Sequence, residues 1–313
     1  MKRDKLLLRT WQAAQFTQTP RNQVPWPVPS SLFHSMLIAH LPTARRGVGS
    51  TRQKNGRVQE VEHSGRHALV TGGGTGIGLA IAQALASQGA EVTITGRDAA
   101  RLQDIAAENP KLHPLGMDVT DEENLRAGVK ASVAARGPIA ICIANAGLAE
   151  PMAWSNIDMT HWRRIMATNL DGCFLTLQSA MDSLGPDDWG RMIAISSIAG
   201  VRGLKGATAY TASKHAVIGM IRALSEEYMG RKMTFNALCP GYVDTPIVTR
   251  NAAEISQRQG ISNEDARAYL AKGNRHRRLL EVDEIAGAAL WLCSDAARSV
   301  NGQAIQIAGG QVS

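Results

Sequence analysis

The sequence predicts an α/β protein: one domain built on a doubly wound, parallel sheet of about seven strands, with helices on both faces. Three observations favour this fold class. From His67 onward, apolar segments of strand length alternate with longer segments of helical periodicity. A glycine-rich turn joins the first such strand to the first helix. The segment Ile139–Ala144 is apolar at every position, as expected for a parallel strand buried on both faces.

The first 62 residues carry the whole net charge of the chain, which is +7. They hold ten of its 34 basic residues and three of its 27 acidic ones, whereas residues 63–313 hold 24 of each. Five prolines break any long helix there, and the apolar stretch Ser31–Leu41 is shorter than the ~20 residues of a membrane span. We expect residues 1–62 to be a disordered basic extension or the product of a start codon placed too far upstream. An organellar transit peptide is the alternative.

The domain expected over residues 63–313 lacks the composition of several functional classes. Its balanced charge and the low aromatic content of the chain, 4%, argue against a nucleic-acid partner, and no segment predicts a membrane partner. The eight histidines and four cysteines of the chain form no metal-binding motif, so no metal is expected. We expect the cysteines to be buried free thiols in a reducing compartment, which predicts a cytoplasmic protein.

The first strand, His67–Thr71, runs into the turn Thr71-Gly72-Gly73-Gly74-Thr75-Gly76-Ile77-Gly78 and then into a helix, Leu79–Ser87. A second strand follows at Glu91–Thr95. Glycines in such a turn permit a tight bend, close approach of the backbone to a phosphate, and packing of the helix on the strand. The helix N-terminus then offers free N–H groups to the anion. The predicted phosphate-binding residues are Thr71, Gly72, Gly76, Ile77 and Gly78.

Further elements follow in regular order. The predicted strands cover Leu112–Met117, Ile139–Ala144, Trp189–Ser196, Phe235–Leu238 and Gln303–Ile307, and the predicted helices cover Asp158–Leu170, Tyr210–Tyr228 and Glu284–Leu292. Polar candidate residues sit at the carboxyl ends of these strands or on the helices that follow, where ligands of open parallel sheets bind. They include Asn145, Asn169, Ser197, Tyr210 and Lys214.

Tyr210 and Lys214 are four residues apart on one predicted helix and therefore share a face. We expect the ammonium group of Lys214 to lower the pKa of the Tyr210 phenol, which could then exchange a proton with a substrate oxygen. A Tyr-x3-Lys pair on its own is equally typical of an exposed helix surface. It gains weight here because Ser197 precedes Tyr210 by thirteen residues, at the end of a strand.

Taken in order, these motifs resemble the short-chain dehydrogenases/reductases over about residues 64–313: Gly72-x3-Gly76-x-Gly78, Asn145-Ala146-Gly147, Asn169, Ser197 and Tyr210-x3-Lys214. The resemblance implies a Rossmann-type fold and a reaction between a secondary alcohol and a ketone. It implies that Tyr210 is the general acid or base, that Lys214 lowers the pKa of Tyr210 and binds the nicotinamide ribose, and that Ser197 positions the substrate oxygen. Asn169 would hold a water that links Lys214 to solvent.

The same resemblance implies a nicotinamide cofactor, with NADP(H) favoured and NAD(H) possible. Gly96 stands where NAD-using members carry an acidic residue, and Arg97 follows, where a guanidinium could pair with the 2′-phosphate of NADP. The alternative is that Arg97 is a solvated loop residue and that Asp98 caps the next helix.

Six further residues are expected to line the cofactor site by resemblance, and some of them have structural alternatives. Asp118 and Val119 would flank the adenine, although Asp118 could equally belong to a helix cap. Asn145 would border the adenosine half while bracing the sheet. Pro240, Gly241 and Thr245 would border the nicotinamide, unless Pro240 and Gly241 are only a turn.

Residues 247–274 correspond to the variable substrate lid of the family, and a basic run follows at Lys272, Arg275, His276, Arg277 and Arg278. That run could meet the phosphates of a coenzyme A thioester or be a solvated turn. The C-terminal half most resembles bacterial 3-oxoacyl thioester reductases and 3-hydroxyacyl dehydrogenases. We therefore expect a ketone or secondary alcohol as substrate, either 3-oxoacyl or small and cyclic, and a homotetramer or homodimer. An NAD-dependent dehydrogenase of a hydroxy acid or ring alcohol, or a catalytically silent nucleotide sensor, are the alternatives.

Overall fold

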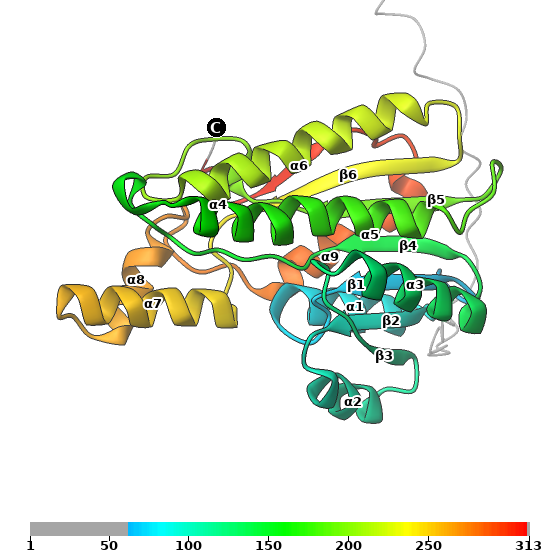
Figure 1. The fold of residues 1–313 in the computed structure, drawn as a ribbon, viewed down its shortest axis with the longest axis horizontal. Coiled ribbons are helices and arrows are strands. Elements are labelled where there is room, and N and C mark those ends of the chain that lie inside the picture. The colour runs from blue at the N-terminus through cyan, green and yellow to red at the C-terminus, as the bar shows by residue number, and fades with distance from the viewer. Residues whose placement is uncertain (1–61, 312–313) are drawn as a thin grey trace, which may run out of the picture. The chain divides into compact units, whose positions relative to one another are not determined.

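The computed structural model describes residues 62–311 (Figure 1). The extension expected over residues 1–62 therefore lies outside the described residues, apart from Glu62. The strands are β1 His67–Thr71, β2 Glu91–Gly96, β3 Leu112–Gly116, β4 Ile139–Ala144, β5 Gly190–Ile195, β6 Met233–Pro240 and β7 Ala304–Ile307. The α-helices are α1 Gly76–Ser87, α2 Ala99–Glu108, α3 Glu122–Arg136, α4 Met159–Met166, α5 Gly172–Met181, α6 Thr208–Glu227, α7 Pro246–Gln259, α8 Asn263–Ala271 and α9 Val282–Cys293.

The seven strands form one sheet in the order β3-β2-β1-β4-β5-β6-β7, and every neighbouring pair is parallel. The predicted doubly wound parallel sheet is confirmed. The chain first builds outward from β1 to β3 and then returns to add β4 on the other side of β1. The strand order thus reverses between β1 and β4, and the loops that leave their carboxyl ends diverge, which opens a crevice for a ligand.

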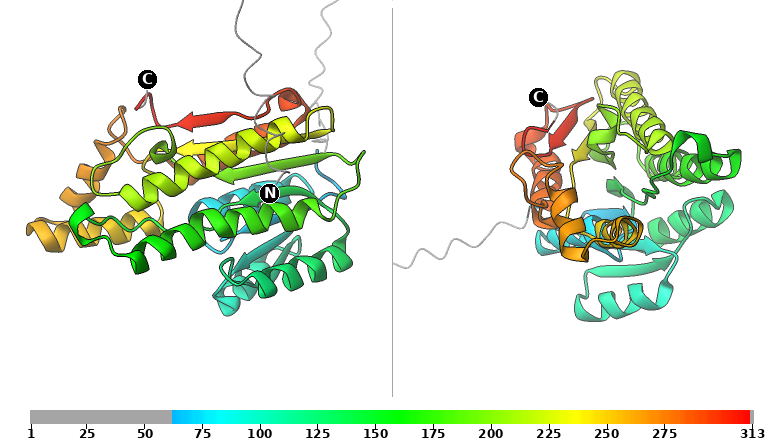
Figure 2. Two further views of the ribbon diagram at one scale, coloured as in Figure 1. Left: turned by 45° about the horizontal axis from the view of Figure 1, so that its top comes forward. Right: turned by 90° about the vertical axis from the view of Figure 1, so that its left-hand side faces the viewer.

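Alternate residues of the strands supply two separate apolar layers. In β1, Ala68 and Val70 belong to one core together with residues of α1, α2 and α9, whereas Leu69 belongs to a second core with residues of α3, α5 and α6. Figures 1 and 2 show these helices on the two sides of the sheet. Because successive side chains of a strand point to opposite faces, a strand covered on both sides must be apolar throughout. This explains the uninterrupted apolar sequence of β4.

The segment from residue 158 to 181 differs from its prediction. A helix was expected from Asp158 to Leu170, but α4 ends at Met166, a π-helical turn spans Ala167–Asp171, and α5 continues directly to Met181. The predicted end at Leu170 is therefore wrong. Gly172 opens α5 and allows close contact with the loop after β3, because a Cβ there would lie 2.7 Å from Val119 Cγ2. None of the helices described by the structure is long and apolar enough to cross a membrane.

The helices α7 and α8 form the part of the molecule predicted to be a lid. They extend beyond the carboxyl end of the sheet (Figure 1) and have a small apolar core of their own, built from Val248, Ala252, Ile255, Ala266 and Leu270. Ile255 and its neighbours in this cluster pack α7 on α8 rather than on the sheet. The lid can therefore move as a unit without breaking the main cores.

Candidate active site

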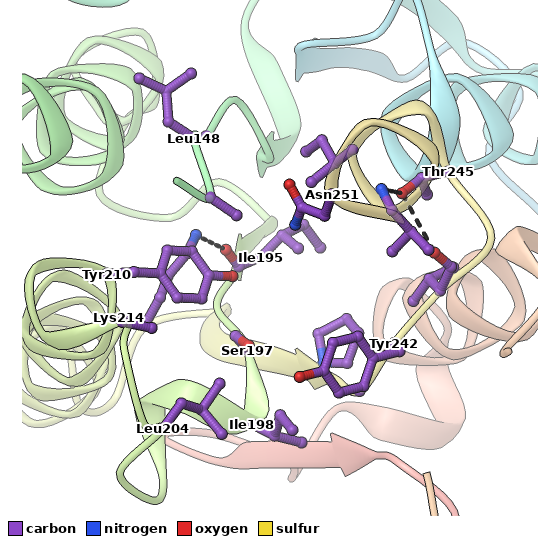
Figure 3. A pocket seen from close by; sticks show the side chains of 18 of the residues that line it. Leu148, Ile195, Ser197, Ile198, Leu204, Tyr210, Lys214, Tyr242, Thr245 and Asn251 are labelled. Atoms are coloured by element: carbon purple, nitrogen blue, oxygen red, sulfur yellow. Dashed lines mark hydrogen bonds between the residues drawn. The ribbon is translucent and has the colours of Figure 1, made fainter. Parts of the chain in front are cut away.

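A cavity of about 240 Å³ opens at the carboxyl ends of the central strands, between α6 and the lid helix α7 (Figure 3). Its walls are largely apolar, as is usual for a small-molecule site with a few convergent polar groups. The structure brings eight of the predicted site residues to this cavity: Ile77, Asn145, Ser197, Tyr210, Lys214, Pro240, Gly241 and Thr245. Predicted residues that are far apart in the sequence, from Ile77 to Thr245, thus meet at one place.

Ser197 and Tyr210 stand together on one side of the cavity (Figure 3). Ser197 caps the short helix Ile198–Gly200, its Oγ accepting from the N–H of Ala199 at 3.1 Å, which fixes the side chain at the end of β5. Tyr210 lies in the first turn of α6. Burial raises the pKa of Tyr210, and hydrogen bonding with Ser197 partly opposes that rise. The phenol therefore holds its proton at neutral pH in this state of the protein.

Lys214 is buried one helical turn after Tyr210, with 5% of its surface exposed. Its Nζ donates to the carbonyl oxygen of Ile195 at 2.8 Å and lies 5.8 Å from the centre of the Tyr210 ring. Burial lowers the pKa of Lys214 to about 8. The expected lowering of the Tyr210 pKa by Lys214 is not found: burial dominates the phenol, and no effect of Lys214 on it is resolved.

Asn169 lies in the π-helical turn and is buried. Its Oδ1 accepts from Leu148 N at 2.7 Å, and its Nδ2 donates to Leu148 O at 2.9 Å and to Ser213 Oγ at 3.0 Å. The side chain thus ties α4 and α5 to the loop after β4 and to α6. Because both amide hydrogens are used, the water expected beside Asn169 would have to be held by another group of this residue, such as its main-chain carbonyl.

The glycine turn has the shape that its sequence predicts. Gly72 and Gly76 adopt positive φ angles of 64° and 51°. A Cβ at Gly78 would collide with the carbonyl oxygen of Gly72 and lie 2.5 Å from Asn145 Nδ2. Helix α1 starts at Gly76, three residues before the predicted start, and no side chain caps its N-terminus. Its first N–H groups therefore remain available to an anion.

Thr71 and Asn145 join the ends of β1 and β4, where the strand order reverses. Asn145 Nδ2 donates to Thr71 O at 2.9 Å and to Gly72 O at 3.3 Å, and Asn145 N donates to Thr71 Oγ1 at 3.0 Å. The bracing expected of Asn145 is present, and it reaches the glycine turn itself. These hydrogen bonds fix the positions of the two strand ends and of the glycine turn relative to one another.

The residues predicted to select the cofactor lie at the ends of β2 and β3. Arg97 is exposed, and the structure gives its side chain no hydrogen bond or ion pair within residues 62–311. Hydrogen bonds from Thr120 lower the pKa of Asp118, and the charge of Arg97 adds a smaller effect in the same direction. Asp98 caps α2 by accepting from Arg101 N at 3.0 Å, as the structural alternative predicted. Asp118 accepts from Thr120 N and Oγ1, while Asp121 is the actual cap of α3. Val119 is buried.

Three neighbours of the cavity were not predicted as site residues. Tyr242 and Asn251 line it directly. Asn274 is fully buried and pins Tyr242, since its Oδ1 accepts from Tyr242 N at 3.0 Å and its Nδ2 donates to Tyr242 O at 2.8 Å. The position of Tyr242 directly after Pro240-Gly241 was a usable signal in the sequence. Asn251 and Asn274 have polar neighbours in the sequence, and nothing in the local pattern distinguishes them as site residues.

The basic run after α8 lies apart from the cavity lining. Arg278 is paired with Glu284 through two contacts of 2.5 and 3.0 Å, in the first turn of α9. A Cβ at Gly309 would lie 2.9 Å from His276 Nε2, so the imidazole packs against the end of the chain. The solvated-turn interpretation accounts for these contacts.

All four cysteines are buried and free, as predicted. Burial raises the pKa of Cys173 to about 12 and that of Cys239 to about 11. Neither thiol therefore offers a nucleophile to the cavity.

Comparison with protein families gives a match to the model of "short chain dehydrogenase" over residues 66–256. Among curated proteins, the chain is 36% identical to nodulation protein G of Azospirillum brasilense over 248 residues, covering 78% of this chain and 96% of that protein. It is 32% identical to D-beta-hydroxybutyrate dehydrogenase of Cupriavidus necator, with 80% and 98% covered. It is 30% identical to a 3-oxoacyl-[acyl-carrier-protein] reductase of Aquifex aeolicus, with 80% and 99% covered.

A solved structure, an actinorhodin polyketide ketoreductase variant with NADPH, is also similar. It has 30% sequence identity and a TM-score of 0.75, and the match covers 79% of this chain and 97% of that one. The likeness thus extends over almost the entire length of each of these relatives.

Proposed function

The chain belongs to the short-chain dehydrogenase family, and on that premise we propose that it is an NAD(P)(H)-dependent oxidoreductase that interconverts a ketone and a secondary alcohol. The observation that carries the proposal is the meeting of Ser197, Tyr210 and Lys214 at one cavity. The intact Tyr210 and Lys214 speak against a catalytically silent nucleotide sensor.

The residues present fit a dinucleotide cofactor. The glycine turn packs tightly, since a Cβ at Gly78 would collide with Gly72, and the uncapped N-terminus of α1 that follows it provides donors for a pyrophosphate. Ile77 and Thr245 extend this surface into the cavity. When bound, the nicotinamide supplies or accepts the hydride, while the chain positions the reactants and provides the electrostatic environment of the reaction.

Tyr210 and Ser197 act on the reacting oxygen. In the direction of reduction, Tyr210 donates its proton to the carbonyl oxygen, and burial keeps that proton in place at neutral pH. Ser197, held in place by its own role as a cap, donates a second hydrogen bond to the same oxygen. In oxidation Tyr210 accepts the proton of the alcohol, so the oxidative rate should increase with pH.

Lys214 and Asn169 assist Tyr210 without contacting the reacting oxygen themselves. Lys214 is in position to place a positive charge beside the phenol as the proton leaves, and its pKa of about 8 leaves it protonated at pH 7. Asn169 holds the loop beside Lys214 through its two hydrogen bonds with Leu148. Gly147 of this loop lies so close that a Cβ there would be 3.3 Å from Asn169 Oδ1 and 3.5 Å from Lys214 Nζ. A water held at the π-helical turn would transfer a proton from solvent to Lys214 after each turnover in the direction of reduction.

We propose NADP(H) as the preferred cofactor. Arg97 stands at the end of β2, exposed and without a partner in the described part of the chain, next to the carboxylate of Asp118. A free guanidinium is suited to a 2′-phosphate, whereas no acidic side chain stands at Gly96 to receive a 2′-hydroxyl.

The proposed substrate is a 3-oxoacyl compound or a small cyclic ketone, reduced in the cytoplasm by a homotetramer or homodimer. Relatives bear names from both substrate groups, including the reductase of Aquifex aeolicus and a cis-4-hydroxycyclohexanecarboxylate dehydrogenase of Sinomonas cyclohexanicum, 34% identical. Exposed Phe174 and Trp291, on α5 and α9, are candidates for contacts between subunits.

The test follows the oxidation of NADPH and of NADH with a panel of ketones that includes acetoacetyl-CoA. Tyr210→Phe is compared with Tyr269→Phe, which alters an exposed tyrosine of the lid. Turnover that disappears only in Tyr210→Phe supports the proposal. Full turnover in Tyr210→Phe would contradict it.

A further inference from the structure

The glycine turn and the carboxyl end of β2 lie side by side. Gly73 N donates to Thr95 O at 3.0 Å, which ties the turn to the last residues of β2. Leu102 of α2 packs beneath both segments, since a Cβ at Gly74 would lie 3.1 Å from Leu102 Cδ2 and one at Gly96 would lie 3.8 Å from Leu102 Cδ1. A dinucleotide whose pyrophosphate binds at the turn would therefore place its adenosine ribose where these segments meet.

Arg101, in the first turn of α2, reaches back to the glycine turn. Its Nε donates to Gly74 O at 2.9 Å. The side chain is exposed, and its terminal nitrogens, Nη1 and Nη2, make no hydrogen bond or ion pair within residues 62–311. Because a guanidinium carries five N–H donors in one plane, four of them remain available to a ligand beside the turn.

The glycine turn contributes no basic side chain of its own. Residues 71–78 contain neither lysine nor arginine. Among the described residues, Arg101 is the one basic side chain that donates a hydrogen bond to this turn. The N-terminus of α1 begins at Gly76, whereas Gly74 lies on the side of the turn that packs on α2. A cation held at Gly74 is thus directed to the adenosine half of a cofactor rather than to its pyrophosphate.

Arg97 brings a second cation to the same region. It follows β2 directly, and its side chain is exposed and has no partner in the part of the chain that the structure describes. The carboxylates nearby have other partners, since Asp98 accepts from Arg101 N and Asp118 accepts from Thr120. A phosphate can accept from both guanidinium groups, and charge-assisted hydrogen bonds of this kind are strong.

We propose that Arg101 is a specificity-determining residue for the cofactor: its Nε holds the glycine turn, while Nη1 and Nη2 bind the 2′-phosphate of NADP(H) together with Arg97. The inference rests on the proposed function and deepens it, because it divides the cofactor preference between two arginines on different elements. Since Gly74 O already orients the Arg101 side chain, binding of the phosphate costs this residue less conformational entropy than it costs the free side chain of Arg97.

The experiment measures, by calorimetric titration, the binding of adenosine 2′,5′-bisphosphate and of 5′-AMP, which differ only in the 2′-phosphate. The proteins compared are the wild type, Arg101→Gln, Arg97→Ala and the double variant. Arg101→Gln keeps an amide that can donate to Gly74 O but lacks the charge and the forked donors. The control is Arg298→Gln, which removes an exposed arginine that likewise donates to a main-chain carbonyl, that of Asp295. Denaturant unfolding shows that the variants are folded.

We expect the wild type and Arg298→Gln to bind the bisphosphate at least tenfold more tightly than 5′-AMP. In Arg101→Gln, the Kd of the bisphosphate should rise about tenfold, the loss of one charge-assisted hydrogen bond, while the Kd of 5′-AMP stays within about twofold. The double variant should bind the two fragments alike.

An unchanged Kd of the bisphosphate in Arg101→Gln would overturn the inference. An equal rise for both fragments would do so too, because Arg101 would then serve only the shape of the turn. A wild type that does not distinguish the fragments would overturn the inference together with the preference for NADP(H). The proposed oxidoreductase activity is tested separately by Tyr210→Phe and would survive any of these results.

Discussion

The ammonium nitrogen of Lys214 lies 2.8 Å from the carbonyl oxygen of Ile195, so the last residue of β5 holds the cation that faces Tyr210. This contact compensates only part of the cost of burying a charge, because the pKa of Lys214 is lowered from 10.5 to about 8. The site thus stores a destabilising group in a position that catalysis requires.

Replacing Lys214 by methionine should therefore stabilise the protein at pH 7 while abolishing turnover. The shift from 10.5 to about 8 corresponds to about 3 kcal/mol, less about 1 kcal/mol for the lost hydrogen bond, so we expect a gain of about 2 kcal/mol. Denaturant unfolding measures this free energy. Lys205→Met, which removes an exposed lysine beside the same cavity, should change neither stability nor turnover by much.

The sign of the pH dependence provides a sharper check. Folded Lys214 releases its proton near pH 8, whereas the unfolded chain does so near 10.5. Between these values the unfolded chain binds more protons, so the free energy of unfolding of the wild type increases with pH relative to Lys214→Met. The advantage of the variant should be complete below pH 8 and vanish toward pH 10.5. A difference that stays constant from pH 7 to 10 would refute the buried ammonium.

Gly78→Ala tests the close packing of the glycine turn. The added Cβ would collide with the Gly72 carbonyl and crowd Asn145, so we expect a loss of about 1–3 kcal/mol and weaker NADPH binding, measured by fluorescence titration. Gly287→Ala, in the exposed part of α9 with nothing within 4 Å, is the control. There the helix propensity of alanine should stabilise the protein by up to about 1 kcal/mol.

Arg97→Ala tests the cofactor preference. Loss of the free guanidinium should raise the KM for NADPH at least tenfold and leave the KM for NADH within about twofold, since a charge-assisted hydrogen bond contributes ~1.5–3 kcal/mol. Arg298→Ala, which removes another exposed arginine, should affect neither. If both cofactors lose affinity equally, Arg97 supports the adenosine site without reading the 2′-phosphate.

Much of the fold followed from the sequence because its signals are local. Apolar runs such as Ile139–Ala144 and the turn from Thr71 to Gly78 predicted strands, the first helix and the parallel sheet, and the structure has all of them. The course of residues 158–181 could not be predicted in this way. There Gly172 packs against Val119, a residue of the loop after β3 more than 50 positions earlier in the chain, and the local sequence carries no sign of this contact.

The candidate site shows the same division. The spacing of motif residues such as Ser197 and Tyr210 in the sequence predicts that they belong to one site, and the structure brings them together. The pKa of Tyr210 was expected to be lowered by Lys214, which sequence spacing suggests, but the degree of burial decides it, and burial is a property of the whole fold. Asn251 likewise became a candidate site residue only when the structure showed that it lies on the face of α7 that lines the cavity.

Asn274 offers a last test, because it links the lid to the cavity without lining it. It is fully buried, and its amide bonds Tyr242 N, Tyr242 O and Arg278 O. Asn274→Ala leaves Tyr242 N and Arg278 O without this partner, whereas Tyr242 O keeps the hydrogen bond from Leu280 N, so we expect a loss of about 2–3 kcal/mol in unfolding free energy. In the protein that remains folded, release of Tyr242 should raise the KM for the substrate more than the Kd for NADPH. Steady-state kinetics measures the first quantity and fluorescence titration the second. Asn263→Ala, at the exposed start of α8, should leave all three quantities unchanged. An Asn274→Ala protein as stable as the wild type would show that water replaces the amide and that Tyr242 is held by other contacts.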